Sequence, residues 1–493
     1  MKLVSTRNNQ ITIGALDAVL KGISQDGGLF IPEKLPSLSL DDIASFKDLS
    51  YPELAAEILS LFFEEIEKSE MLEMTKSAYA SFDVAETVPI KKLEDDLFVM
   101  ELFHGPTLAF KDVALQMLPR LMAKALEAQG SKEDVLILTA TSGDTGKAAL
   151  EGFCDVDRVK IVVFYPNDGV SDMQKLQMVT QEGDNTFVYA VNGNFDDTQN
   201  GVKAIFTDPG AILKLIQKGY MLSSANSINI GRLTPQVVYY FWAYLQLVKS
   251  GVIEMRDAMD AAVPTGNFGN ILAAYYARAM GLPIGRLVCA SNSNKVLTDF
   301  FESKNYSIKD RAFIKTASPS MDILISSNLE RLVADMVGSD AVVRDLMHAL
   351  KTQGVYDIAP YMDKEKAAVF YAGWASEPDT KTTIKNTFED TGYLLDPHTA
   401  VGVKVAKEYL AESKGKNPCV VAATASPYKF SCDVLGAFEG EKAFDDAFLQ
   451  AEKLAKMTKT TVPEKIAELK HKKTRHTGVI EKREMLDAIL ADI

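Results

Sequence analysis

The chain has 493 residues, of which 47% are hydrophobic and 24% are charged, and its formal net charge is −14 at pH 7. This length predicts two or three domains with a large buried core. The acidic balance argues against nucleic acid or an anionic membrane surface as the main partner.

Cysteine usage and hydropathy indicate where the protein is found. The four cysteines are scattered, without a C-x-x-C pair or a histidine at ligand spacing, so neither a disulfide framework nor a metal site is expected. The start, MKLVSTRNNQ, lacks the apolar stretch of a signal peptide. The most apolar run, residues 237–248, is shorter than the roughly 20 residues that a membrane helix needs. We expect a cytoplasmic protein that does not enter the membrane, either a monomer or a homodimer.

The predicted elements begin with a mostly helical region and continue as an α/β alternation. Residues 1–95 are amphipathic, with Leu54, Ile58, Leu61 and Phe62 on one helical face. Near-continuous apolar strands then alternate with helices, which indicates parallel sheet covered on both faces. The predicted strands are 135–140, 159–165, 187–191, 221–225, 261–264, 287–290 and 419–423.

Two later segments depart from this alternation. Residues 296–390 contain few strand candidates and are predicted to be helical insertions or packing layers. The tail beyond Ala451 is predicted to be helical, and its basic residues are expected on a solvated helix face. The chain therefore divides into an N-terminal region, two α/β lobes and a helical tail, with bounds 1–95, 96–260, 261–450 and 451–493.

Three turns rich in Gly, Asn or hydroxyl residues follow predicted strands, which is where parallel α/β sheets bind ligands. The sharpest is Gly266–Asn270, ahead of a helix predicted from Ile271. Small residues let the backbone approach a phosphate, and the free N–H groups of the helix start can donate to it. A tight turn of this kind can also serve only as a connection, so this signal is moderate by itself.

The second turn covers residues 141–147, with the sequence TSGDTGK. A nucleotide P-loop would need glycine five residues before Gly146 and a hydroxyl residue after Lys147, and both are missing. The ATPase interpretation therefore fails. What remains is a hydroxyl-rich helix start suited to a carboxylate or a phosphate, or a simple helix cap by Ser142 or Asp144.

The third turn, residues 226–232, precedes a helix that is predicted to begin at Thr234 and Pro235. Arg232 offers a bidentate fork that suits a phosphate. The alternative for this arginine is a surface salt bridge.

Lys111 stands out because of its local sequence. It follows a Gly-Pro turn at 105–106 and precedes a helix predicted from about Asp112. Apolar neighbours and the positive end of a helix dipole both disfavour its charged form and favour a nucleophilic amine. Most lysines are solvated surface groups, and Asp112 has an ordinary alternative role as a first-turn acid, so the pattern by itself is weak.

Resemblance to a known family adds the specificity that this pattern lacks. The stretch around Lys111 resembles the cofactor-lysine motif of threonine synthases, in their longer-chain bacterial and fungal branch. Six further motifs follow the order of that family, at residues 26–32, 141–146, 226–232, 266–270, 395–402 and 423–427. The resemblance implies a fold-type-II pyridoxal-phosphate architecture, similar to the tryptophan synthase β chain, with the cofactor between two α/β lobes.

The resemblance also implies site residues, position by position. Lys111 would hold the cofactor covalently, and Thr424 would face its pyridine nitrogen. The cofactor phosphate would lie on Gly266, Asn267, Phe268, Gly269 and Asn270. The loop with Ser142, Asp144 and Thr145 would receive the substrate carboxylate and border the cofactor's ring oxygen, and Ser227 and Arg232 would bind the substrate phosphate. Many fold-type-II enzymes have Asn in place of Asp144, so its contact with the cofactor stays open.

The reaction that this implies is the conversion of O-phospho-L-homoserine and water to L-threonine and phosphate. Lys111 would move the protons, and Arg232 would stabilise the departing phosphate. The alternatives are a fold-type-II phospholyase or amino-acid dehydratase, and a non-catalytic sensor. A second phosphate site argues against the dehydratase, and the retained lysine argues against the sensor. His104 and His398 are expected to have structural roles.

Overall fold

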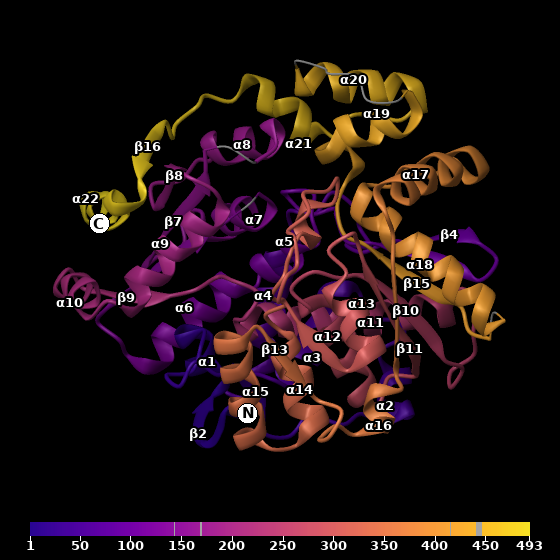
Figure 1. Cartoon of the computed structure of the whole chain (residues 1–493), viewed down its shortest axis with the longest axis horizontal. Coiled ribbons are helices and arrows are strands. Elements are labelled where there is room, and N and C mark those ends of the chain that lie inside the picture. The colour runs from indigo at the N-terminus through magenta and orange to yellow at the C-terminus, as the bar shows by residue number, and fades with distance from the viewer. Residues whose placement is uncertain (142, 168–169, 415, 440–445) are drawn as a thin grey trace.

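The computed structural model describes residues 1–141, 143–167, 170–414, 416–439 and 446–493. Two sheets organise the chain. A five-stranded sheet has the order β16-β8-β7-β6-β9, and a six-stranded sheet has the order β14-β11-β10-β15-β5-β4. All neighbouring strands are parallel except β4 and β5. In Figure 1 the first sheet lies beside α7 to α9 and the second beside α18.

The strands of the five-stranded sheet are β6 (Asp134–Ala140), β7 (Val159–Pro166), β8 (Thr186–Asn192), β9 (Tyr220–Ser223) and β16 (Gly478–Glu481). Those of the six-stranded sheet are β4 (Ile90–Glu94), β5 (Leu97–Glu101), β10 (Met259–Pro264), β11 (Ile284–Ser291), β14 (Phe370–Trp374) and β15 (Cys419–Ala423).

The buried strands explain why the sequence predicted parallel sheet. β10 and β15 are buried at every residue, and β6 and β7 nearly so, as expected for strands with both faces covered. The α/β architecture and the seven predicted strands are confirmed, with bounds that differ by at most three residues. Within these two sheets, the prediction missed β4, β5, β14 and β16.

Two of these missed strands correct specific expectations. β14 lies within residues 296–390 and forms one edge of the six-stranded sheet, so this segment is more than a helical insertion. The expectation of a purely helical tail is wrong for β16, which pairs in parallel with β8. In Figure 1 the C-terminal segment runs from α19 and α20 across the molecule to reach the five-stranded sheet.

Each sheet collects strands from separate parts of the chain. β5 lies between β15 and β4, although the sequence analysis placed residues 96–260 in the first lobe. β16 brings the tail into the sheet formed by β6 to β9. The division at residues 96, 261 and 451 stays a prediction about chain order, and the strand pairs β4–β5, β5–β15 and β8–β16 cross it.

The N-terminal region contains a small sheet as well as helices. Its strands are β1 (Lys2–Ser5), β2 (Asn8–Gly14) and β3 (Phe30–Pro32), in the order β2-β1-β3 and antiparallel. Its helices are α1 (Ala15–Lys21), α2 (Leu40–Ser45), α3 (Tyr51–Ser60) and α4 (Lys68–Tyr79). The helical content was predicted and the strands were not. Leu54, Ile58 and Phe62 are buried, so the predicted apolar helix face packs into the core.

The remaining helices cover the sheets and join the lobes. Near the first sheet lie α5 (Lys111–Leu115), α6 (Leu118–Gln129), α7 (Asp144–Phe153), α8 (Asp172–Val179), α9 (Phe195–Thr207) and α10 (Pro209–Gln217). The others include α11 (Ile230–Lys249), α12 (Gly269–Ala279), α13 (Val296–Ser303), α14 (Leu329–Val337), α15 (Asp340–Gln353), α17 (Glu377–Thr391), α18 (Pro397–Ser413), α19 (Ser431–Glu439), α20 (Ala447–Thr458) and α22 (Met485–Asp492). α11 contacts α3, α5 and α12, which makes it the central helix.

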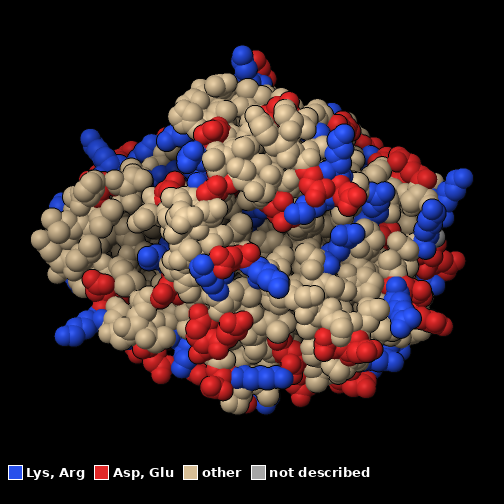
Figure 2. Space-filling model, turned by 90° about the horizontal axis from the view of Figure 1, so that it is seen from below, with Lys and Arg blue, Asp and Glu red and all other residues tan. Residues whose placement is uncertain are grey.

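The surface and the hydropathy of the helices agree with the composition. Figure 2 shows acidic and basic side chains interspersed over one face, with acidic residues numerous along its lower part. Within the part of the chain that the structure describes, no helix is long and apolar enough to cross a membrane.

Candidate active site

Lys111 lies at the start of α5 and is buried, with 8% of its surface exposed. Its Nζ atom donates hydrogen bonds to Asp144 Oδ2 and to Ser320 Oγ, each at 3.3 Å. Asp144 is the first residue of α7, directly after the turn that follows β6. The structure therefore brings the predicted cofactor lysine and the predicted substrate loop together at the carboxyl ends of their strands.

The carboxylate of Asp144 has further partners. A second buried lysine, Lys429, forms an ion pair with Oδ1 at 2.7 Å. The side chain of Gln174 donates to the same oxygen at 2.8 Å. Lys429 also donates to the carbonyl oxygen of Thr107 at 2.9 Å. Asp144 is thus saturated with donors, which is the arrangement expected of an ionised carboxylate.

The electrostatics follow from burial and these neighbours. Burial lowers the pKa of Lys111 and outweighs Asp144, which acts in the opposite direction, while the charges of Lys429 and Arg232 lower it further. Burial alone would raise the pKa of Asp144, but Lys429 and Lys111 outweigh it and hold that pKa below its usual range. The site therefore keeps Asp144 as a carboxylate and shifts the amine of Lys111 toward its neutral form.

The predicted cofactor-phosphate turn joins β10 to α12. Phe268 is the N-cap residue with φ of 65°, which turns the chain sharply into the helix. A Cβ atom on Gly266 would lie 2.6 Å from the carbonyl oxygen of Ser320, so only glycine fits there. Asn270 accepts hydrogen bonds from Tyr239 at 2.7 Å and from Tyr240 at 2.5 Å.

Two buried donors in this region lack partners among the residues that the structure describes. They are Asn270 Nδ2 and Arg232 Nε. Unpaired buried donors are rare in folded proteins and indicate that something else accepts from them. Together with the N–H groups at the start of α12, they suit an anionic group, so the residues present fit a cofactor phosphate and a second phosphate.

Arg232 lies in the first turn of α11, because this helix begins at Ile230 and is capped by Asn229. The prediction that the helix begins at Thr234 is therefore wrong, and Pro235 lies inside the helix. Arg232 is 3% exposed, so it does not form the surface salt bridge considered as an alternative. Its Nη1 atom donates to the carbonyl oxygen of Ala225 at 3.0 Å. Burial lowers its pKa to about 10.

The segment 326–328 connects the two predicted phosphate turns. Ser326 Oγ donates to the carbonyl oxygen of Gly266 at 2.7 Å, and Asn328 N donates to that of Asn267 at 3.0 Å. Ser327 Oγ lies 3.4 Å from Ser227 Oγ and donates to Asn267 Oδ1 at 3.3 Å. The turn at 266–270 and the turn at 226–232 are therefore held next to each other.

Thr424 follows β15 and lies beside the lysine segment. Its carbonyl oxygen accepts from Phe110 N at 2.9 Å, and its own N–H donates to Thr399 Oγ1 at 3.3 Å. His398 shares Asp396 with Thr399 and accepts a hydrogen bond from Ser320 N at 3.2 Å. His398 thus supports the backbone of Ser320, in agreement with a structural role.

Two further predicted residues lie in the substrate loop. Ser142 lies outside the described residues. Thr145 is in the first turn of α7, next to Asp144. Gly143, directly before α7, has a φ of 146°, and a Cβ atom there would lie 2.5 Å from the side chain of Gln174. Because of this positive φ and the lack of room for a Cβ atom beside Gln174, the position before α7 requires glycine.

The sequence analysis did not find Ser320, Gln174 or Lys429. Ser320 lies in a short 3-10 turn (Pro319–Met321), and Lys429 lies in another (Pro427–Phe430). The only signal for Lys429 was a lysine within a few residues of the motif at 423–427. Nothing in the local sequence of Ser320 distinguishes it from a solvent-exposed turn residue.

His104 lies between two carboxylates. Its Nδ1 and Nε2 atoms lie 2.9 Å from Asp83 Oδ1 and 3.0 Å from Glu101 Oε2. Burial alone would lower the pKa of His104, but the hydrogen bonds and charges of both carboxylates outweigh it and raise the pKa to about 9.

This pKa predicts how stability depends on pH. The charged form of His104 stabilises the fold fully below its unfolded pKa of about 6.5, and this contribution is lost as the pH rises through about 9. We expect His104→Gln to lower the free energy of unfolding by about 2 kcal/mol near pH 6 and by much less above pH 9. Urea unfolding of both proteins across this range measures the difference. A difference that stays constant with pH would contradict the ion pair.

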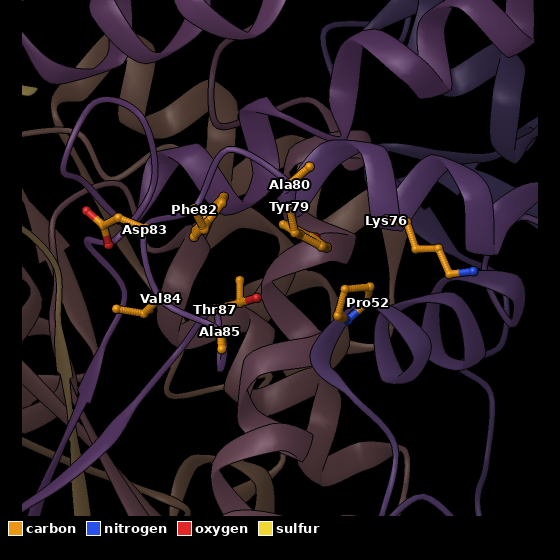
Figure 3. Close-up of a pocket in the computed structure, with 9 residues that line it drawn as sticks. All are labelled: Pro52, Lys76, Tyr79, Ala80, Phe82, Asp83, Val84, Ala85 and Thr87. Carbon is orange, nitrogen blue, oxygen red and sulfur yellow. The ribbon is translucent and has the colours of Figure 1, made fainter.

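A separate pocket of about 340 Å³ lies between α3, α4 and the connection to β4. In Figure 3 Asp83 and Lys76 lie at opposite ends of it, with Phe82 and Tyr79 between them. None of its lining residues belongs to the predicted site. Within the described residues, no three His, Cys, Asp or Glu side chains gather as metal ligands.

Three family models match the chain in sequence order. "Threonine synthase N terminus" matches residues 2–79, "Pyridoxal-phosphate dependent enzyme" matches 85–425, and "Threonine synthase, C-terminal" matches 399–489. The threonine synthase of Pseudomonas aeruginosa is 41% identical over 432 residues, which covers 87% of this chain and 89% of that protein. The human threonine synthase-like 1 is 40% identical over 434 residues, and this chain spans 58% of its length.

Solved structures agree with these relatives. The threonine synthase of Brucella melitensis, solved with bound pyridoxal phosphate, has a TM-score of 0.88 at 39% identity, covering 100% of this chain and 99% of that one. The yeast threonine synthase has a TM-score of 0.88 at 33% identity, covering 100% and 98%.

Proposed function

Because the chain belongs to the threonine synthase family, we propose that it converts O-phospho-L-homoserine and water to L-threonine and inorganic phosphate. The observation that carries this proposal is the pairing of two buried groups in one site. Lys111 supplies an amine of lowered pKa, and Arg232 supplies an unpaired N–H near enough for its charge to act on that amine. A lysine alone would suit many reactions, whereas a second, separate anion site suits a phosphorylated substrate.

The fold is that of fold-type-II pyridoxal-phosphate enzymes, and the cofactor is pyridoxal phosphate. When bound, the cofactor supplies an electron sink for charge that develops on the substrate. Lys111 would hold it covalently, Gly266, Asn267, Phe268, Gly269 and Asn270 would hold its phosphate, and Thr424 would face its ring nitrogen. A neutral hydroxyl at Thr424 gives weaker support to a protonated ring than a carboxylate would.

The residues of this chain would then act on the substrate as follows. Thr145, at the N-terminal end of α7, would bind the substrate carboxylate together with Ser142. Lys111, once released, is placed to take the proton from Cα, and its lowered pKa favours the neutral amine that can do so. After it has given that proton up, it can take a proton from Cβ. Ser227 and Arg232 would bind the substrate phosphate and stabilise its growing charge as it leaves Cγ. Water adds at Cβ, and protons return to Cα and Cγ.

The burial of these groups limits the access of bulk water to the reacting atoms. Lys111, Asp144 and Arg232 are each less than 10% exposed, so bulk water has little access to them. Exclusion of water strengthens the contact between Arg232 and a phosphate. It also protects the unprotonated amine until water is needed at Cβ.

The cysteines indicate the compartment in which the protein is expected to act. The small-molecule substrate requires no macromolecular partner. All four cysteines are free, and Cys289 and Cys419 are buried, which suits a reducing compartment such as the cytoplasm. We expect a monomer or a homodimer, and size-exclusion chromatography with light scattering would distinguish them.

The test is a visible absorption spectrum of the purified protein before and after addition of O-phospho-L-homoserine, with phosphate and threonine assayed in the same tube. We expect a visible cofactor band that shifts with substrate, and equal amounts of both products. A band with phosphate but no threonine would support the phospholyase instead. No band, even after addition of pyridoxal phosphate, would contradict the proposal.

A further inference from the structure

Two buried lysines face one carboxylate in this site, and the proposed reaction uses only one of them. Lys111 Nζ lies 3.3 Å from Asp144 Oδ2, whereas Lys429 Nζ lies 2.7 Å from Asp144 Oδ1. The side chain of Lys429 is 0% exposed and that of Lys111 is 9% exposed. A fully buried lysine is rare and costs stability unless it is paired, so the position of Lys429 calls for a reason.

We propose that Lys429 is a positioning residue for the reaction: it pairs with Asp144, fixes that carboxylate, and leaves the amine of Lys111 available as an uncharged nucleophile and base. This inference rests on the proposed function of Lys111. It concerns a residue outside the predicted site, in the turn after β15.

The contacts of Lys429 show why it, and not Lys111, is the permanent partner of Asp144. Its shorter distance to Asp144 is combined with a hydrogen bond to the carbonyl oxygen of Thr107 at 2.9 Å, which anchors it to the backbone. Thr107 is itself fixed, because its N–H and its hydroxyl donate to Asp112 at 2.8 and 2.6 Å. Gln174 donates to the same oxygen of Asp144, Oδ1, at 2.8 Å. The contacts that hold Lys429 in place therefore do not depend on whether Lys111 is a free amine or holds the cofactor.

This independence is important because Lys111 alternates during turnover between a free amine and the form that holds the cofactor. As a free amine it contacts Asp144 and Ser320, and when it holds the cofactor its nitrogen is charged only when it is protonated. Without Lys429, every state with an uncharged nitrogen on Lys111 would leave a buried carboxylate without a cation beside it, which is strongly destabilising. With Lys429 in place, Asp144 keeps a cation beside it throughout.

The charges around Lys111 determine in which direction its titration shifts when Lys429 is removed. The groups that act on it are the anion Asp144 and the cations Lys429 and Arg232. Removing Lys429 removes one cation and exposes Lys111 to the full charge of Asp144. Both changes favour a protonated nitrogen on Lys111, so its titration must move to higher pH.

The experiment is a pH titration of the visible band of the cofactor-loaded full chain, which reports protonation at the nitrogen of Lys111. We expect K429M to titrate at least about one pH unit higher than the wild type. K429R, which keeps the charge, should titrate within a few tenths of a unit of the wild type, and D144N should titrate lower. After removal of the cofactor, acylation of Lys111 near pH 8, followed by mass spectrometry, should be about 10-fold slower in K429M.

K147M is the matched control. Lys147 is also buried and forms an ion pair, with Glu151 on α7 at 2.8 Å, but it does not contact Lys111 or Asp144. We expect K147M to lose stability and to keep the wild-type titration. A lysine with a merely structural role would behave in this way, so the same result for K429M would overturn the inference.

The outcomes separate this inference from the proposed function. A wild-type chain without a cofactor band contradicts the function, whereas a wild-type band with an unshifted K429M contradicts only the role of Lys429. If K429M does not fold, D144N/K429M removes both buried charges and is compared with D144N. A higher titration in the double variant supports the inference, and an equal one overturns it.

Discussion

Lys111→Ala is expected to lower turnover of O-phospho-L-homoserine by at least about 10³-fold and to abolish the visible band of covalently held cofactor. The substitution removes the one amine that, among the described residues, lies beside Ser320 and within hydrogen-bonding distance of Asp144 Oδ2. Stability should change little, because Asp144 retains Lys429 and Gln174 as partners. Steady-state release of phosphate and the absorption spectrum measure both effects.

A small amine provides the control for this variant. If the site of Lys111→Ala is intact and lacks only its amine, methylamine at high concentration should restore part of the activity. Rescue should increase with pH, because the free base is the active form. Normal turnover without added amine would remove Lys111 from the reaction.

Arg232→Met is expected to lower kcat/KM for the phosphorylated substrate by about 10²-fold, since it removes charge-assisted hydrogen bonds that contribute about 3 kcal/mol together. We expect both KM and kcat to change. KM rises because the phosphate is bound less tightly, and kcat falls because its growing charge is less stabilised as it leaves. Inorganic phosphate should inhibit the variant about 10²-fold less strongly.

Arg232→Lys distinguishes charge from geometry. A lysine keeps the charge but lacks the fork, so we expect activity between that of the wild type and Arg232→Met. Thermal unfolding of both variants is the control for folding, since the hydrogen bond from Arg232 to Ala225 is lost as well. An unchanged kcat/KM and unchanged phosphate inhibition in a folded Arg232→Met would place the substrate phosphate elsewhere.

The sheets were predictable where the strands are apolar throughout. β6, β7, β10 and β15 are mostly apolar because helices cover both faces of a parallel sheet, so their own residues indicate that they are buried. β16 could not be found in this way. It is an edge strand of four residues with two of them exposed, and what makes it a strand is the neighbouring edge of β8.

Pro235 explains the displaced start of α11. Pro favours the first turn of helices, so the sequence placed the start next to it. The actual start is four residues earlier, where Asn229 accepts a hydrogen bond from Gly231 N at 2.9 Å and caps the helix. The structural consequence is local but important, because it moves Arg232 from a loop into a buried helical turn.

The candidate site was predictable only in part. Turns such as 266–270 are recognisable from their small residues and their place after a strand. Lys111 was distinguished by its motif. Ser320 and Lys429 were not predictable, because each reaches the site through contacts with residues far away in sequence, and neither has a local pattern that reports such contacts.

The five-stranded sheet obtains its last strand from the C-terminal part of the chain, and this affects how the protein is made. During synthesis β8 emerges long before β16, so its free edge stays unpaired while β10, β11, β14 and β15 of the six-stranded sheet are still being translated. An unpaired edge is a template for association with other chains. The nascent first lobe is thus exposed to aggregation until residues 478–481 leave the ribosome, and a chaperone that shields β8 would act in that interval.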